Sequence, residues 1–347
     1  MTVDLNGHDL NIQVSGDKNI LAGIYAGTNE YIDIVNSGEK KTVTVSASHA
    51  TDTRGSNGIY AGGNSHLHIA GPVVIDGVFT KGDSVSGINI QGAGSAGGNT
   101  GSEVIIDGPL TIKNVTAQRG RGNGINASGI RVTSDSSKVT VNGDVDIDGI
   151  QGSGLYTIGA DTEISVGGGS ISAAADANHS KQYFAARVDK GIININMSSG
   201  EPGTSALQMK GDLYTTKEYG QKVVEYSGGE LVDFSNAGVM NVALVTADSA
   251  WTGAQTYIID KSDYGTGGYT AHDSGVFNLW LKNGASGQMK SSPAPQTGFN
   301  LSRGARCQRS EAERTAHPRD IFIRRTAVIF PLNSTADIQR FSISMIN

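Results

Sequence analysis

The sequence predicts an all-β fold, a right-handed parallel β-helix, that extends from the first residue to about residue 286. Glycine contributes 48 of the 347 residues, whereas proline contributes 7 and charged residues only 17%. Such a composition suits many short strands joined by tight turns. A turn-and-strand segment also recurs along the chain. Within each copy apolar and polar residues alternate, so each strand is expected to have one buried face and one wet face.

The recurring segment is an aliphatic residue, a turn with glycine in its third position, and an alternating strand. Its copies align without gaps and are IAGPVVIDGV at 69–78, IDGPLTIKNV at 106–115 and VNGDVDIDGI at 141–150. In a β-helix, equivalent residues of successive coils lie about 4.8 Å apart. We therefore expect two internal ladders of aliphatic side chains. One contains Ile69, Ile106 and Val141, and the other contains Ile75, Ile112 and Ile147.

A second motif, a glycine followed by an aliphatic residue, recurs upstream of these segments. Its copies are GIYA at 58–61, GINI at 87–90, GIRV at 129–132 and GLYT at 154–157, with a weaker GIYA at 23–26. Loops of variable length separate the pieces, so the period drifts while the strands keep register. A β-sandwich would not repeat one turn and one strand at matching offsets. We expect about 25 to 35 residues per coil and about nine to twelve coils.

The chain divides into three parts. Residues 1–204 carry the repeats, and residues 205–286 carry longer hydrophobic strands and both tryptophans, a pattern that predicts a cap over the open end of the stack. Residues 287–347 read as a linker and an arginine-rich tail. Residues 303–347 hold 1 glycine, 8 arginines and no lysine, for a net charge of +4, against −10 for residues 1–302. We interpret the tail as disordered or read out of frame.

Composition also excludes some functions. A body with a net charge of −10 argues against nucleic-acid binding, which needs a basic face. The single cysteine, Cys307, lies in the tail, so the body can form no internal disulfide and no thiolate metal site. No apolar run is long enough to span a membrane, and the first residues do not resemble a signal peptide. We expect a monomer that binds no cofactor.

Three C-terminal segments are VTADSAWTG at 245–253, YGTGGY at 264–269 and NLWLKNGA at 278–285. Together they closely resemble the C-terminal end of autotransporter passenger domains, the type V secretion family with pectin-lyase-like β-helices. The resemblance covers residues 1–286, loosely over the coils and more specifically over 240–286. It implies that residues 205–286 act as an autochaperone-like cap that nucleates the β-helix outside the cell. Trp251, Phe277 and Trp280 would suit that cap.

The sequence departs from this family at both ends. In the family a translocator barrel of alternating strands follows the passenger. Residues 287–347 are too short for a barrel, and one strand-like run at 319–330 is all that matches. We interpret the chain as a truncated or frame-shifted copy that lacks signal peptide and barrel. The resemblance implies a location at the cell surface or outside the cell, with membrane contact only through a barrel that this chain lacks.

Two patterns could bind metal ions. Asp144, Asp146 and Asp148 match the opening of a calcium loop, but the twelfth position is Leu155 where such a loop needs glutamate. We interpret the three acids as a solvated stripe on an outer strand face. His66 and His68 share one outward face and could hold a metal if a third ligand approached, but the sequence predicts none. We assign no metal ligand.

Three further motifs are similar to signatures of catalysis or of cell-wall anchoring. A Gly-Asp-Ser at 82–84 with Asp176 and His179 is similar to blocks of one lipase family, but Ser84 lies in a polar loop between β coils. The Asn-Gly-Asp at 142–144 is weak evidence for a polysaccharide-cleaving site and reads as a turn. Residues 294–298 are faintly similar to a sortase signal and read as a linker. We assign no catalytic or cofactor-binding residue.

These features predict a non-enzymatic passenger that acts as an adhesin or display rod. Its partner would be a glycan or protein on a host or bacterial surface, bound along the exposed strand faces and loops. The alternative is a carbohydrate-active β-helix enzyme, a polysaccharide lyase or hydrolase. That alternative requires carboxylates and basic groups that converge on one face of the rod.

Overall fold

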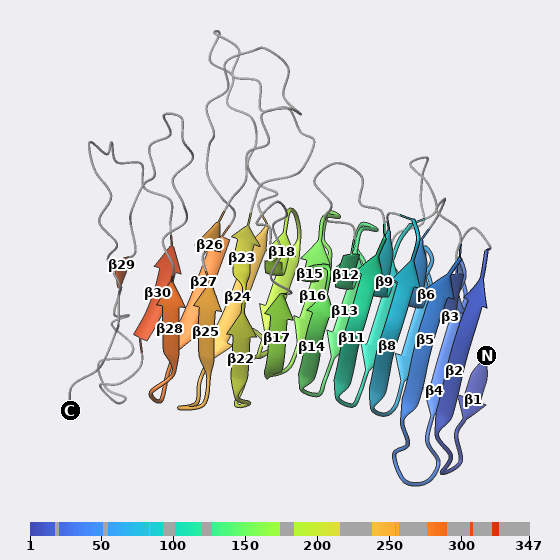
Figure 1. The fold of residues 1–347 in the computed structure, drawn as a ribbon. Helices are drawn as coiled ribbons and strands as arrows, with labels where there is room; N and C mark the ends of the chain where they lie inside the picture. The colour runs from blue at the N-terminus through green and yellow to red at the C-terminus, as the bar shows by residue number, and fades with distance from the viewer. Residues whose placement is uncertain are drawn as a thin grey trace, which may run out of the picture.

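The computed structural model describes residues 1–17, 21–50, 55–82, 84–92, 101–118, 127–173, 184–215, 238–253, 255–256, 276–289, 306–307 and 321–325. Within these residues the fold is all-β, without a helix, and three parallel sheets wind into a right-handed parallel β-helix (Figure 1). Eight coils have strands in all three sheets, and a ninth has strands in two of them. The predicted fold class is confirmed.

Sheet A is the longest of the three. Its parallel strands, in spatial order, are β1 (Thr2–Asp4), β4 (Tyr31–Val35), β7 (His66–Ile69), β10 (Glu103–Ile106), β13 (Lys138–Val141), β16 (Glu163–Val166), β19 (Ile192–Ile195), β24 (Val239–Leu244) and β27 (Val276–Leu281). Two tail strands, β30 (Ile321–Arg325) and β29 (Arg306–Cys307), continue this sheet in antiparallel pairing beyond β27. Part of the strand-like run expected at 319–330 is therefore a strand.

Sheet B faces the viewer in Figure 1. Its strands are β2 (Leu10–Gly16), β5 (Val43–His49), β8 (Val73–Thr80), β11 (Leu110–Ala117), β14 (Val145–Ile150), β17 (Gly169–Ala173), β22 (Leu207–Lys210), β25 (Ala250–Gly253) and β28 (Ser286–Met289). The recurring segments of the sequence cover the end of a sheet A strand, the turn, and the sheet B strand. The alignment of the three copies therefore reproduces the register between neighbouring coils.

Sheet C contains the glycine motifs. Its strands are β3 (Leu21–Ala26), β6 (Ser56–Ala61), β9 (Val85–Ile90), β12 (Ala127–Val132), β15 (Gly152–Thr157), β18 (Phe184–Val188), β23 (Asp212–Thr215) and β26 (Gln255–Thr256). A small antiparallel hairpin of β20 (Met197–Ser198) and β21 (Glu201–Pro202) lies outside the three sheets. In sheets A and B one strand face is buried and the other is wetter, as expected. In sheet C that expectation is wrong, because every residue of β6 and β9 is buried.

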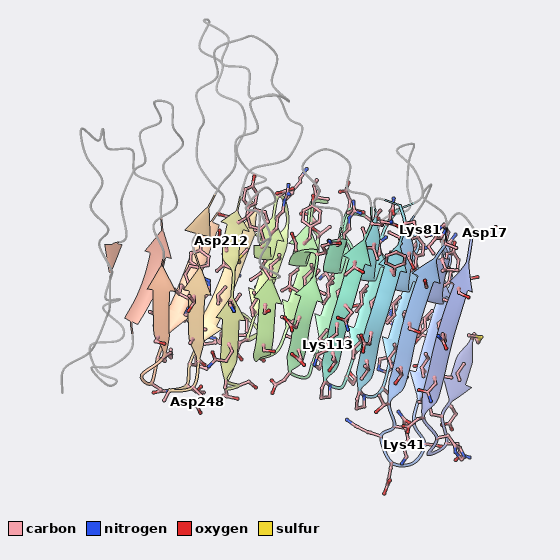
Figure 2. The ribbon with its side chains drawn as sticks, in the orientation of Figure 1. Asp17, Lys41, Lys81, Lys113, Asp212 and Asp248 are labelled. Atoms are coloured by element: carbon pink, nitrogen blue, oxygen red, sulfur yellow. The ribbon has the colours of Figure 1, made fainter. Side chains whose placement is uncertain are left out.

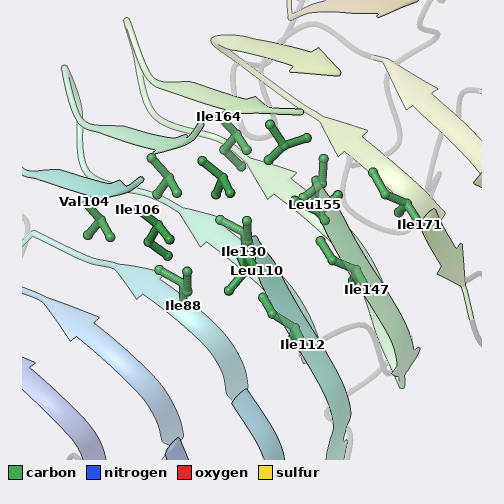
Figure 3. Packing of buried hydrophobic residues seen from close by; sticks show 14 of the residues in the cluster. Ile88, Val104, Ile106, Leu110, Ile112, Ile130, Ile147, Leu155, Ile164 and Ile171 are labelled. Carbon is green, nitrogen blue, oxygen red and sulfur yellow. The ribbon is translucent and has the colours of Figure 1, made fainter. Parts of the chain in front are cut away.

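Both aliphatic ladders exist. Ile106 pairs with Ile69 and Val141 in sheet A, and Ile112 pairs with Ile75 and Ile147 in sheet B. All six side chains are at most 3% exposed and belong to one core that runs the length of the rod. In Figure 3, Ile112, Ile147 and Ile171 follow one another on neighbouring strands. Burying one such side chain contributes roughly 1.5–3 kcal/mol.

The glycine of the second motif is required by packing against this ladder. A Cβ on Gly129 would lie 2.5 Å from the carbonyl oxygen of Gly154 and 3.0 Å from Ile147 Cγ2. Gly87 has the same relation to Gly129 and Ile112 one coil earlier. The conformational freedom of glycine is not the reason, since neither residue has a positive φ. In β6, β9, β12 and β15 the motif glycine lies where the backbone passes close to the core.

The strands after residue 205 extend the same three sheets. Trp251 is 1% exposed, and its Nε1 donates a hydrogen bond to the carbonyl oxygen of Gly211 at 3.1 Å. Its ring meets that of Phe277 edge-on, with centroids 5.8 Å apart. These two large rings fill the core of the last coils. The separate capping role expected for residues 205–286 remains a prediction, and residues 264–269 of the resemblance lie outside the described part of the chain.

Candidate functional site

His68 links three coils on the outer face of sheet A. Its Nδ1 lies 2.8 Å from Asp33 Oδ1 in the preceding coil, and its Nε2 lies 2.8 Å from Asp107 Oδ2 in the following coil. The flanking Leu67 and Ile69 point into the core, which is why the histidine points outward. A neutral imidazole has one donor, so two carboxylate acceptors favour the doubly protonated ring.

His66 is held in a similar way. Its Nδ1 lies 3.1 Å from Glu103 Oε2, and its ring stacks on Tyr31 with centroids 4.6 Å apart. The two histidines do share the outward face of β7, as expected. Within the described residues, however, no three histidine, cysteine or acidic side chains are arranged to hold a metal ion. The side chains around the histidines are their hydrogen-bond and stacking partners.

The pKa of His68 is raised, chiefly by the hydrogen bond to Asp107, with a smaller contribution from Asp33 and an opposing effect of burial. A raised folded pKa stabilises the fold fully below the unfolded value of about 6.5, and this stabilisation is lost as pH rises through the folded pKa. We expect the stability advantage of the wild type over His68→Gln to decline above about pH 6.5. The decline should be about 1 kcal/mol or less, because solvent screens a partly exposed pair.

Urea unfolding of wild type and His68→Gln between pH 5.5 and 8.5 measures this difference. His8→Gln is the control for loss of an exposed histidine. Parallel stability profiles for wild type and His68→Gln would contradict the assignment of a proton-linked bridge to His68.

The acids of the calcium-like motif lie on the outer side of sheet B, as expected. Asp146 accepts a hydrogen bond from Ser170 Oγ at 2.7 Å and pairs with Lys113 Nζ at 2.7 Å. Figure 2 shows Lys113 on the face of sheet B that is turned to the viewer. The pKa of Asp146 is lowered, first by Lys113 and then by Ser170. Asp148 accepts a hydrogen bond from Ser172 Oγ at 2.5 Å, and Asp144 is exposed.

The position where a calcium loop carries its glutamate is Leu155, which is fully buried in sheet C. The twelfth position of the loop is therefore occupied by a core residue that cannot bind an ion. The row of acids is an outward stripe in which Asp146 and Asp148 already have partners from neighbouring coils.

The described residues of the catalytic motifs lie in separate parts of the fold. Asn142 donates a hydrogen bond from Nδ2 to Asp107 Oδ1 at 2.9 Å, so it belongs to the His68 cluster on sheet A. Ser84 lies just before β9, in a loop as expected, and its Oγ accepts a hydrogen bond from Arg131 Nη1 at 3.2 Å. The proposed partners of Ser84, Asp176 and His179, and the residues 294–298, lie outside the described part of the chain.

Three asparagines form a ladder on sheet A that the repeat pattern did not predict. Asn241 donates from Nδ2 to Asn194 Oδ1 at 2.7 Å, and Asn278 donates to Asn241 Oδ1 at 2.8 Å. The three residues occupy one register position in successive coils. Such stacked amides satisfy one another along a parallel sheet, so this ladder stabilises the stack.

The outer face of sheet C carries a different kind of column. Residues at one register position in seven successive coils form what we call the tyrosine–arginine column: Tyr25, Tyr60, Asn89, Arg131, Tyr156, Arg187 and Tyr214. Their neighbours on both sides along the strands are core residues such as Ile88 and Ile90, so the column points away from the core. The rings of Tyr25 and Tyr60 stack with centroids 5.1 Å apart.

Arg187 lies between Tyr156 and Tyr214 in this column. It lies over the rings of Tyr156 and Tyr214, at 4.9 and 5.1 Å from their centroids, and its Nη2 lies 2.7 Å from Asp189 Oδ2. Burial alone would lower the pKa of Arg187, but the ion pair with Asp189 and the nearby tyrosines raise it overall. Tyr156 also donates its hydroxyl to Asp189 at 3.0 Å. Burial, followed by the negative charge of Asp189, raises the pKa of Tyr156.

Arg131 has no such partner. Its guanidinium lies 5.9 Å from the centroid of Tyr156 and donates to Ser84, but the described residues provide it with no carboxylate. Its Nε is buried without a hydrogen-bond partner. Burial lowers the pKa of Arg131, opposed by Tyr156 and assisted by Arg187. Since pairing normally accompanies the burial of a charge, this cation is the strongest candidate for a ligand contact.

The sequence contains a signal for this column in the glycine motif. Its residues from Tyr25 to Tyr156 occupy the third position of the glycine motif, which reads tyrosine, tyrosine, asparagine, arginine and tyrosine from coil to coil. Aligning the motifs in that position would have exposed a row of aromatic and cationic side chains on one face. Arg187 lies outside the motif, because β18 has Ala185 where β3, β6, β9, β12 and β15 have glycine.

Comparisons with protein-family models, with curated proteins and with solved structures found no match to this chain. In the part of the chain that the structure describes, no helix is long and apolar enough to span a membrane.

Proposed function

We propose that this chain is a non-enzymatic, surface-displayed binding rod, an adhesin-like passenger whose β-helix holds a row of ligand-binding side chains. The observation that carries this proposal is the tyrosine–arginine column on the outer face of sheet C. Aromatic and arginine side chains are the residues most enriched where proteins bind macromolecular partners. A column with one position per coil suits an extended partner.

The polar clusters on the other two sheets support the same proposal. Asp33 and Asp107 are both bound by His68, and Asp146 is bound by Lys113 and Ser170. A polysaccharide-cleaving enzyme would need carboxylates available for proton transfer or nucleophilic attack. Here the acids connect neighbouring coils, which is a structural role. The resemblance of residues 240–286 to autotransporter passengers supports a location at the cell surface.

The test combines binding with product analysis. Purified chain is applied to arrays of surface glycans and surface proteins, and each bound polysaccharide is incubated with the protein and assayed for new reducing or unsaturated ends. We expect retention of a ligand that stays intact. Time-dependent appearance of new ends would favour the polysaccharide lyase or hydrolase and overturn the proposal, as would failure to retain any arrayed ligand.

A further inference from the structure

Among the described residues, no carboxylate compensates the positive charge on Arg131. Two guanidinium groups, those of Arg131 and Arg187, flank Tyr156, and Asp189 neutralises the second of them. Counted over the described residues alone, the cluster therefore keeps one net positive charge in a largely desolvated place. An unpaired charge in such surroundings is costly, and a bound anion would relieve that cost.

Unsatisfied polar atoms lie near this cation on the same outer face of sheet C. Asn89, one coil before Arg131, is 3% exposed, and its Oδ1 has no hydrogen-bond partner. Ser86 is fully buried and its hydroxyl also has no partner. Val85 and Gly87 face the core, so Ser86 between them faces outward with Asn89. An acceptor such as Asn89 Oδ1 requires a donor, and a ligand hydroxyl can provide one.

We propose that the outer face of sheet C around Arg131 binds an acidic glycan, a polysaccharide whose sugar rings carry carboxylates. The carboxylate would pair with Arg131, because a planar guanidinium can donate two parallel hydrogen bonds to the two carboxylate oxygens. Asn89 and Ser86 are buried, so the surface has to open on binding before sugar hydroxyls can satisfy them. Chloride or sulfate would satisfy Arg131 but could not donate to Asn89 Oδ1. The column continues along the rod on both sides of Arg131, so further sugars can follow it. This inference rests on the proposed function and names its ligand class.

The test uses two probes, hyaluronan and alginate oligosaccharides, each compared with its carboxyl-reduced form. Binding is measured by titration calorimetry on the full chain. We expect an acidic oligosaccharide to bind, and its carboxyl-reduced form to bind at least about tenfold more weakly, the usual effect of losing a charged hydrogen bond. Arg131→Gln should weaken acidic binding to a similar extent, and Arg131→Lys should restore part of it. Lys113→Gln removes a cation from sheet B and should change nothing.

Each outcome of the binding test either supports or overturns the acidic-glycan inference. Equal binding of the acidic and reduced forms, or failure of both acidic probes to bind, overturns the acidic-glycan inference while leaving the binding-rod proposal to its own array test. Polyglutamate that competes with equal affinity would show an acidic peptide site instead. If Arg131→Gln fails to fold by circular dichroism, the two glycan forms on the wild-type chain still decide. Release of reducing ends would instead defeat the proposed function.

Discussion

Replacing Ile112 by alanine is expected to destabilise the β-helix by about 2–5 kcal/mol. Ile112 is fully buried and lies in the sheet B ladder between Ile75 and Ile147. Its neighbour Gly87 approaches so closely that a Cβ there would lie 2.7 Å from Ile112 Cγ2. Removal of the isoleucine side chain therefore leaves a cavity lined by rigid backbone, which cannot collapse to fill it. Urea unfolding followed by circular dichroism measures the change in free energy.

Ile192→Ala is the matched control. Ile192 also lies in a β-strand, β19, but its side chain is 38% exposed. Its loss is expected to cost about 1 kcal/mol or less. If the two alanine variants lost equal stability, the inner ladder would not be the main source of stability along the rod.

The sequence predicted the ladders because a strand has a side-chain period of two and the turns repeat. Ile75, Ile112 and Ile147 follow from aligning three segments without gaps, and the alignment reproduces the observed pairing. The same reasoning placed His66, His68 and the acids of β14 on outer faces. Alternation along each strand was therefore enough to predict which of these side chains face the core and which face outward.

The contacts between coils could not be predicted in this way. His68 is 35 residues from Asp33 and 39 from Asp107, and the second contact also crosses to a later position along the neighbouring strand. Such diagonal contacts depend on side-chain rotamers, which a repeat pattern does not contain. The burial of every residue of β6 and β9 in sheet C was missed for a related reason. At Gly58 and at Gly87 both the glycine and the isoleucine that follows it face the core, so strict alternation fails there.

The candidate site needs both kinds of information. The position of Arg131 in the column follows from the motif, but its lack of a carboxylate partner does not. Asp189 follows β18 directly and binds Arg187 two positions earlier, whereas no acid occupies the corresponding place after β12, where Thr133 stands. The presence of an acid at the end of the strand therefore distinguishes Arg187, which is held in an ion pair, from Arg131, which we propose binds a ligand.

Asp189→Asn is expected to destabilise the fold by about 3–5 kcal/mol, the usual effect of removing one partner of a buried ion pair. The Asp189 side chain is fully buried and that of Arg187 is 13% exposed. Asp189 accepts two hydrogen bonds from Arg187 Nε and Nη2 and a third from the hydroxyl of Tyr156. Asparagine retains the shape but replaces one acceptor oxygen by a donor and removes the charge. Chemical unfolding at neutral pH measures the loss.

Asp146→Asn tests whether burial is the cause. Asp146 pairs with Lys113 at the same 2.7 Å separation, but the two side chains are 43% and 44% exposed, so solvent already screens that pair. The expected loss is a small fraction of the loss for Asp189→Asn. Equal losses would contradict the argument that Asp189 compensates a desolvated guanidinium, and with it the contrast that distinguishes Arg131 as the cation left for an acidic ligand.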